Sequence, residues 1–114
     1  MSFTVTNSLL THNTATGWGA NPHPAGTPGG GNGGAIANDG NRFVLTVTDT
    51  LIEDNVANEG GGGIFFVSNN RTGNLVITDS TLTRNDSLGF ETSGYPGIFY
   101  LGSGPPIVTG STLS

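Results

Sequence analysis

Four ionisable side chains stand at related positions of the sequence and are the strongest candidates for chemistry. His12, Asp54 and Arg84 each directly precede an Asn, and Glu53 precedes Asp54. An imidazole, a carboxylate and a guanidinium side by side could transfer protons or bind a sugar. Enzymes that cut polysaccharides need such groups, either as clustered carboxylates or as a bound Ca²⁺ with a base. These residues can act together only if the fold brings distant positions of the chain into contact.

A repeated pattern predicts that contact. An aliphatic residue is followed by Thr, a turn residue, Ser or Thr, a free position, a second aliphatic, two polar residues and Asn. The pattern begins at Val5, Val47, Ile77 and, in incomplete form, at Val108, so that the starts are 42, 30 and 31 residues apart. The extra length of the first interval lies in the Gly/Pro-rich segment 14–33, which we expect to be a loop. Such a period, with three strand-like segments per repeat and no helical periodicity, predicts an all-β solenoid of about three and a half circuits.

Circuits stacked about 4.8 Å apart would form columns of like side chains. Asn13, Asn55 and Asn85 would form a polar column at a bend, where each amide bonds the next one and free backbone groups. We predict that this Asn ladder is structural. The predicted interior columns are Val5, Val47, Ile77 and Val108; Leu10, Ile52, Leu82 and Leu113; Ile36, Ile64 and Ile98; and Phe3, Leu45, Leu75 and Pro106.

The charged column of His12, Asp54 and Arg84 has two interpretations. Asp54 would lie between an imidazole and a guanidinium, which could form an acid–base or sugar-binding cluster. The column could equally be an exposed cross-strand charge ladder, worth a few tenths of a kcal/mol per pair. Threonine occupies the positions equivalent to Glu53 in the neighbouring circuits, so no second carboxylate completes a hydrolase pair. The sequence favours the charge ladder, and these three residues are weak catalytic candidates.

Asp49 and Asp79 are the candidates for metal binding. They share one column with Asn7 and Gly110, and stacked carboxylates could hold a Ca²⁺ between them. Asp and Asn are also ordinary turn formers that bond their own backbone, and we favour this interpretation. The run NDGN at 38–41 lacks the spacing of an EF-hand and predicts a plain turn. We therefore expect no cofactor, with Ca²⁺ as the alternative.

Composition and charge exclude several classes of protein. The chain has 114 residues, enough for one domain, and is rich in Gly with only 10% charged residues. Its only Lys or Arg residues are three Arg, which are outnumbered by eight carboxylates. This excess of negative charge argues against nucleic acid and anionic membrane surfaces as partners. No apolar run is long enough to insert into a membrane, and the start of the sequence does not resemble a signal peptide. The absence of Cys excludes a disulfide scaffold.

Several short motifs resemble those of a known family. GGAI (33–36) and GGGI (61–64), combined with LTHN (10–13), IEDN (52–55) and LTRN (82–85), resemble the GGAI and FxxN repeats of polymorphic outer-membrane proteins. They also resemble bacterial secreted right-handed parallel β-helix proteins with a pectin-lyase-like fold. Leu or Ile replaces Phe in every FxxN copy, and the third circuit has PGIF in place of GGAI. The resemblance implies that residues 1–114 form a single right-handed parallel β-helix domain, or part of one, in an extracellular or cell-surface protein.

Three functions remain open. We expect a non-catalytic structural or adhesive module of an exported protein that contacts carbohydrate or stacks on itself. The alternative is part of a polysaccharide lyase or glycoside hydrolase. Ice binding is a third hypothesis, because an outward column of threonines resembles the Thr rows with which ice-binding β-solenoids order water. This column comprises Thr6, Thr48, Thr78 and Thr109.

The surfaces that could bind partners are the aromatic column and the two ends. We expect about half of Phe65, Phe66, Phe99 and Tyr100 to be exposed, where they could stack on sugar rings. The first circuit starts on the regular strand FTVT and the last stops at TLS, so neither end resembles a cap. Open strand edges favour pairing with another chain. We therefore expect further circuits of a longer solenoid, or copies stacked head to tail into an open filament.

Overall fold

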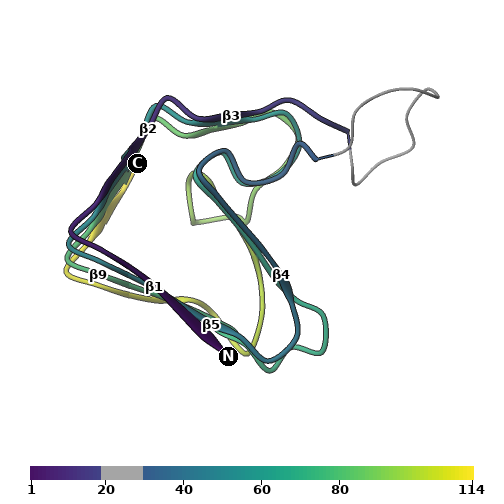
Figure 1. Ribbon diagram of the computed structural model, residues 1–114, viewed down its shortest axis with the longest axis vertical. Coiled ribbons are helices and arrows are strands. Elements are labelled where there is room, and N and C mark those ends of the chain that lie inside the picture. The colour runs from purple at the N-terminus through teal and green to yellow at the C-terminus, as the bar shows by residue number, and fades with distance from the viewer. Residues whose placement is uncertain (19–29) are drawn as a thin grey trace.

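The computed structural model describes residues 1–18 and 30–114. All elements in this part of the chain are strands, and no helix long and apolar enough to cross a membrane occurs among them. Every strand pairing is parallel, and the strands form four sheets that the chain visits in the same order in each circuit. Figure 1 shows successive circuits superimposed along the view. An all-β chain with parallel strands in stacked sheets is consistent with a β-helix-like solenoid, and this part of the prediction is confirmed.

The four sheets, here called A to D, are built as follows. Sheet A contains β1 (Ser2–Thr6), β5 (Val44–Thr48), β9 (Asn74–Thr78) and β13 (Ile107–Thr109). Sheet B contains β2 (Leu9–Thr11), β6 (Leu51–Glu53), β10 (Thr81–Thr83) and β14 (Thr112–Leu113). Sheet C contains β3 (Thr14–Ala15), β7 (Val56–Ala57) and β11 (Asp86–Ser87). Sheet D contains β4 (Ile36–Gly40), β8 (Ile64–Ser68) and β12 (Ile98–Leu101).

The register of the sheets produces three of the four predicted interior columns, while the fourth is incomplete because Phe3 is 51% exposed. Val5 pairs with Val47, Val47 with Ile77, and Ile77 with Val108 in sheet A. The second aliphatic column pairs in the same way in sheet B, and the Ile column in sheet D. In the middle circuits these side chains are fully buried, as Val47, Ile52 and Ile77 show. Burial of this apolar interior is the main force that holds the circuits together.

A second polar column lies at the corner between sheets A and B. Each hydroxyl in it donates to the carbonyl oxygen two residues earlier, at 2.8 to 2.9 Å. Three of the four also accept a backbone N–H from the previous circuit: Thr50 Oγ1 from Ser8 at 3.4 Å, and Ser80 Oγ from Thr50 at 3.1 Å. Ser111 Oγ accepts from Ser80 in the same way at 3.0 Å. The Ser/Thr position of the repeat therefore closes this corner, a role that the sequence analysis did not assign to it.

Two sequence predictions about the strands were wrong. The repeat was expected to have three strand segments, but each full circuit has four, because the two-residue strands of sheet C follow each Asn. The run 38–41 was expected to be a turn, but Asn38 and Asp39 lie in β4 and pair with Phe66 and Val67. Pairing along β8 overrides the turn preference of these residues, and the chain bends at 41–42 instead.

The Gly/Pro-rich loop was predicted at 14–33, yet Thr14–Ala15 is a strand, and residues 19–29 lie outside the described part.

Glycine is required where the chain enters sheet D. Gly33 and Gly61 have φ values of 73° and 70°, in the left-handed region. A Cβ at either position would collide with the carbonyl oxygen three residues later, of Ile36 or Ile64. The Gly-rich motifs before the Ile column therefore permit a tight turn that other residues could not make.

The outer edge of sheet D, at β12, is closed by residues of the same circuit, which the sequence analysis did not predict. In a parallel strand alternate residues bond to opposite neighbours, so Ile98 and Tyr100 face away from β8. Ile98 accepts from the Thr92 N–H at 2.8 Å and donates to the Tyr95 carbonyl at 3.0 Å. Tyr100 N–H donates to Thr92 Oγ1 at 2.8 Å, and that hydroxyl donates to the Tyr100 carbonyl at 3.4 Å. Residues 92–95 thus occupy the place that a further strand of sheet D would take.

Candidate functional site

The Asn ladder lies at the bend between sheets B and C. Asn55 Oδ1 accepts both the backbone N–H and the side-chain Nδ2 of Asn13, at 2.9 and 3.0 Å. Asn85 Oδ1 accepts the same two groups from Asn55, at 3.3 and 2.9 Å. Each Nδ2 of the upper two residues also donates to a strand carbonyl one circuit below, of Leu10 or Ile52. Every donor and acceptor of the fully buried Asn55 side chain is satisfied in this way.

The charged column occupies the position directly before this ladder and has its own backbone constraint. His12, Asp54 and Arg84 have φ values of 58°, 57° and 52°. Left-handed backbone of this kind is uncommon for residues with a Cβ and turns their side chains away from the interior. The bend therefore fixes where these side chains point, while their chemical type is free to vary between circuits.

Arg84 binds the two carboxylates of the circuit below it. Its Nε donates to Asp54 Oδ1 at 2.7 Å, and its terminal nitrogen donates to Glu53 Oε2 at 2.8 Å and to Asp54 Oδ2 at 3.3 Å. The hydrogen bond from Arg84 is the main reason why the pKa of Asp54 lies below its ordinary value of 3.8, and the same bond raises the pKa of Arg84. The Arg84 side chain is 62% exposed, so solvent screens these ion pairs. The arrangement keeps Asp54 ionised and makes it a poor proton donor.

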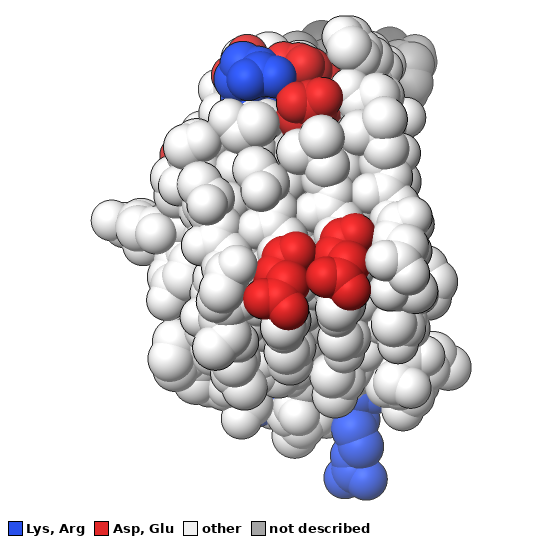
Figure 2. Space-filling model, turned by 90° about the vertical axis from the view of Figure 1, so that its left-hand side faces the viewer, with Lys and Arg blue, Asp and Glu red and all other residues white. Residues whose placement is uncertain are grey.

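His12 lies beside this cluster but has a different partner. Its Nδ1 is 2.8 Å from the hydroxyl of Thr11, its neighbour in the chain. His12, Asp54, Arg84, Val56 and Asp86 line an open depression of about 600 Å³. Figure 2 shows that the charged side chains on the left-hand side of the molecule gather in a few small groups on an otherwise uncharged surface. The three predicted residues therefore share one shallow surface, where only Asp54 and Arg84 form a bonded pair.

The two metal candidates lie at the turn between sheets A and B. Asp49 and Asp79 have φ values of 50° and 48°, and Asn7 and Gly110 share this left-handed conformation. The Asp49 and Asp79 N–H groups each donate to the carbonyl of a Thr in the next circuit, at 3.2 and 3.0 Å. The described residues contain no group of three or more His, Asp or Glu side chains that could hold a metal ion. The geometry of this column is that of a repeated turn.

The aromatic column is divided between the interior and a half-buried surface. Phe66 and Tyr100 are buried and stacked with ring centroids 5.4 Å apart. Phe65 and Phe99 are half-buried and stacked at 5.3 Å, and Phe90 meets Phe99 edge-on at 5.1 Å. The outer pair is thus less exposed than the sequence suggested, because Phe90 covers part of it.

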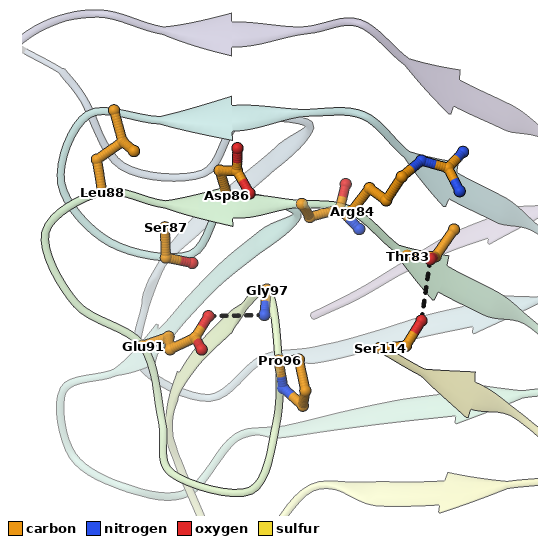
Figure 3. A pocket seen from close by; sticks show the side chains of 10 residues that line it. Thr83, Arg84, Asp86, Ser87, Leu88, Glu91, Pro96, Gly97 and Ser114 are labelled. Atoms are coloured by element: carbon orange, nitrogen blue, oxygen red, sulfur yellow. Dashed lines mark hydrogen bonds between the residues drawn. The ribbon is translucent and has the colours of Figure 1, made fainter.

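A second depression lies where sheet C ends, and Figure 3 shows it from close by. It has a volume of about 490 Å³ and is bounded by β11, by Glu91, Pro96 and Gly97, and by Ser114. Two hydrogen bonds fix its walls: Ser114 Oγ to Thr83 Oγ1 at 2.9 Å, and Gly97 N–H to Glu91 Oε2 at 2.8 Å. We call this depression the sheet C step.

Comparison with protein families, with curated proteins and with solved structures found no match. The function of the chain is therefore inferred from its repeats and from the geometry of these surfaces.

Three residues with defined roles were not found from the sequence. Glu91 and Thr92 close the edge of sheet D, and they stand outside the repeated pattern that guided the sequence analysis. Glu59 is a carboxylate with 1% exposure whose backbone carbonyl accepts from Gly89 and Phe90, at 2.8 and 3.0 Å. Its position between a small residue and a run of glycines carries no recognisable signal. The PHP run at 22–24, in the predicted loop, lies outside the described residues.

Proposed function

We propose that this chain is a non-catalytic structural and adhesive module, a right-handed parallel β-helix with a pectin-lyase-like fold, in an exported bacterial protein. The GGAI and FxxN-like repeats support this proposal, since they resemble those of secreted β-helix proteins. The stacked parallel sheets are the architecture that such repeats would build. In this role the solenoid is a rigid spacer that presents regular surfaces outside the cell.

The observation that carries the non-catalytic role is the mutual neutralisation of the charged column. A glycosidase needs one carboxyl group held protonated and a second held ionised at a defined distance. Asp54 and Glu53 both bind the same guanidinium, which favours the ionised form of Asp54. An ion pair on an exposed surface does not supply the low-dielectric environment that raises the pKa of a catalytic acid. The competing proposal, a polysaccharide-active enzyme, would need acid–base groups from outside the described residues.

Incubation with acidic plant and bacterial polysaccharides tests this role. The protein should release no new reducing ends and no unsaturated products. Sustained turnover that is abolished by Asp54→Asn, with unchanged thermal unfolding, would replace the proposal with the enzymatic one. Turnover that survives Asp54→Asn would come from a contaminant or from a site elsewhere on the chain. Arg84→Gln, which removes the other partner of the same ion pair, is the matched control for Asp54→Asn.

Carbohydrate contact and stacking are the binding modes that fit this module. Phe65 and Phe99 form a half-exposed stacked pair that could pack against a sugar ring. The outer edges of sheets A and B carry strands without a further neighbour among the described residues, where additional circuits or another copy could pair. Retention on a polysaccharide matrix should fall for Phe65→Ala and stay unchanged for Val44→Ala, an exposed apolar residue on sheet A.

Ice binding is a second candidate, favoured by one observation. Thr6, Thr48, Thr78 and Thr109 pair in register across all four strands of sheet A. The flanking row contains Val76 and Ile107 and is less regular. If the chain is a non-catalytic adhesive module, its solutions should show no thermal hysteresis on freezing. A measurable hysteresis that Thr48→Lys removes would favour ice binding.

A further inference from the structure

The pattern N-x-S/T, which marks acceptors of N-linked glycosylation, occurs twice in the chain. The two copies are NRT at 70–72 and NDS at 85–87. In this modification a sugar is attached to the side-chain nitrogen of the Asn, and the hydroxyl two residues later is part of the acceptor. So short a pattern arises easily by chance in a chain rich in Asn, Ser and Thr. The surroundings of each Asn therefore decide whether it can react.

The first copy lies at the tip of an exposed turn. Residues 69–72 connect β8 with β9, and Asn70, Arg71 and Thr72 are all exposed. Arg71 has a φ of 59°, and this left-handed backbone helps to reverse the chain at the tip. The base of the turn is fixed by Ser68, a fully buried residue whose Oγ accepts the Thr72 N–H at 3.1 Å. The turn thus displays the Asn70 amide to solvent on a well-anchored base.

Thr72 binds the target amide through its oxygen and leaves its nitrogen open. Thr72 Oγ1 donates to Asn70 Oδ1 at 2.6 Å, and the Thr72 N–H donates to the same oxygen at 3.3 Å. Asn70 Nδ2 donates to none of the residues that the structure describes. An amide nitrogen is a weak nucleophile, and when it loses a proton the negative charge lies largely on the oxygen. Two donors at that oxygen stabilise the charge, because hydrogen bonds to ionised acceptors are the strong ones.

The second copy has the opposite surroundings. Asn85 is 7% exposed, its Nδ2 donates to the Ile52 carbonyl at 2.9 Å, and its Oδ1 accepts from Asn55. Of the groups that the structure describes, Ser87 Oγ bonds the Gly62 N–H, at 2.8 Å, and not the Asn85 amide. A transferase could reach Asn85 only if the Asn ladder came apart. The same pattern therefore forms an open turn at one place and a closed corner at the other.

We propose that Asn70 is an acceptor site for N-linked glycosylation by a separate transferase. The donor is a sugar bound through its C1 to a diphosphate. Asn70 Nδ2 attacks C1, so that the N–C1 bond forms while the C1–O bond to the diphosphate breaks. The diphosphate leaves with the bonding electron pair, and the Nδ2 proton passes to a base of the transferase. The attached sugar projects into solvent from the turn between sheets D and A. This inference does not depend on the proposed adhesive role.

Sugar transfer to the purified, folded protein tests the inference in two arms. One arm uses UDP-glucose with a soluble N-glycosyltransferase that accepts N-x-S/T, and the other uses a lipid-diphosphate-linked oligosaccharide with a membrane oligosaccharyltransferase. Mass spectrometry of the intact chain and of its peptides locates the sugar. We expect modification of Asn70 and none of Asn85 in at least one arm, and the productive arm identifies the source of the sugar. Synthetic peptides of residues 68–74 and 83–89 are the matched controls, and both should be modified because neither is folded.

Three variants separate the acceptor from its neighbours in the turn. Asn70→Gln removes the acceptor and should abolish the modification of the folded chain. Thr72→Val removes the hydroxyl that bonds Asn70 Oδ1 and should also abolish it, whereas Thr72→Ser retains a hydroxyl and should preserve it. Because both positions are exposed, the variants should keep the thermal unfolding of the wild type.

Any of four results would overturn the inference. The folded chain could stay unmodified at Asn70 in both arms while the peptide of residues 68–74 is modified. That peptide could itself fail as an acceptor in both arms. Asn85 could be modified as readily as Asn70 in the folded chain, which would show that the fold does not select the site. Thr72→Val could be modified at the rate of the wild type, which would remove the role of the hydroxyl.

Discussion

Two columns of side chains lie next to each other along the chain and differ in almost every physical respect. Asn13, Asn55 and Asn85 repeat one residue type and bond one another through both side chain and backbone. The residues directly before them are a His, an Asp and an Arg, whose side chains lie at the surface. The Asn ladder holds the bend between sheets B and C together, whereas the side chains of the charged column only project from this bend. Repetition of residue type marks the positions on which the stack depends, and variation marks the positions that the stack leaves free.

Removing the central amide of the ladder should have the largest effect among the following predictions. Asn55→Ala leaves the backbone N–H of Asn13 and the Leu10 carbonyl without their side-chain partner, and it creates a small cavity. We expect a loss of about 1 to 3 kcal/mol in the free energy of unfolding, measured by denaturant titration. Asn13→Ala is the control, because Asn13 is exposed and ends the ladder. An equal loss in both variants would contradict the cooperative role of the ladder.

The hydroxyl column extends the comparison to a second corner. Thr50→Val keeps the shape of the side chain and removes the acceptor of the Ser8 N–H and the donor to the Thr48 carbonyl. Thr50 is 4% exposed, so we expect a loss of about 1 kcal/mol in the free energy of unfolding. Thr48→Val, on the outward face of sheet A, should change stability by less than half of this amount. A neutral Thr50→Val would show that the corner is held by its apolar contacts alone.

The charged column should have a small effect that depends on pH. The folded chain holds the pKa of Asp54 below its ordinary value, so this group stabilises the fold above that value and the contribution is lost as pH falls through the folded pKa. The melting temperature of the wild type should therefore fall slightly more than that of Arg84→Gln on acidification below about pH 4. Parallel melting curves for the two proteins across this range would show that the ion pair adds nothing.

Calcium should have the smallest effect. Asp49 and Asp79 have the geometry of a repeated turn and lack a third carboxylate among the described residues. We expect no change in melting temperature on addition of Ca²⁺ in excess over protein, and the same result for Asp49→Asn. A rise in melting temperature that Asp49→Asn abolishes would establish a metal site in this column.

The sequence predicted the register of the stacked circuits well because similar residues recur at equivalent positions of each circuit. Val47 and Ile77, or Ile64 and Ile98, can be aligned from the pattern alone. The prediction from the sequence failed where a single circuit departs from the repeated pattern. Glu91 and Thr92 close the edge of sheet D through contacts within one circuit, and they occupy no position of the repeated pattern. Asn38 and Asp39 have turn propensity that pairing with β8 overrides, which local sequence cannot reveal.

The candidate surfaces were predicted only in part for a related reason. The common position of Asp54 and Arg84 follows from the repeat, but their contact depends on side-chain rotamers that the pattern does not specify. The sheet C step arises because sheets C and D hold three strands each while A and B hold four.

Exchanging amide and carboxylate at the two adjacent positions tests the central claim most directly. Asn55→Asp puts a carboxylate into a fully buried position and removes both Nδ2 donors, whereas Asp54→Asn makes the reverse change on the surface. At neutral pH we predict that Asn55→Asp lowers the free energy of unfolding by at least about 2 kcal/mol. Asp54→Asn should change it far less, because solvent screens the exposed ion pair with Arg84. Losses of similar size in the two variants, or a larger loss for Asp54→Asn, would contradict the division between a column that holds the stack and a column that the stack displays.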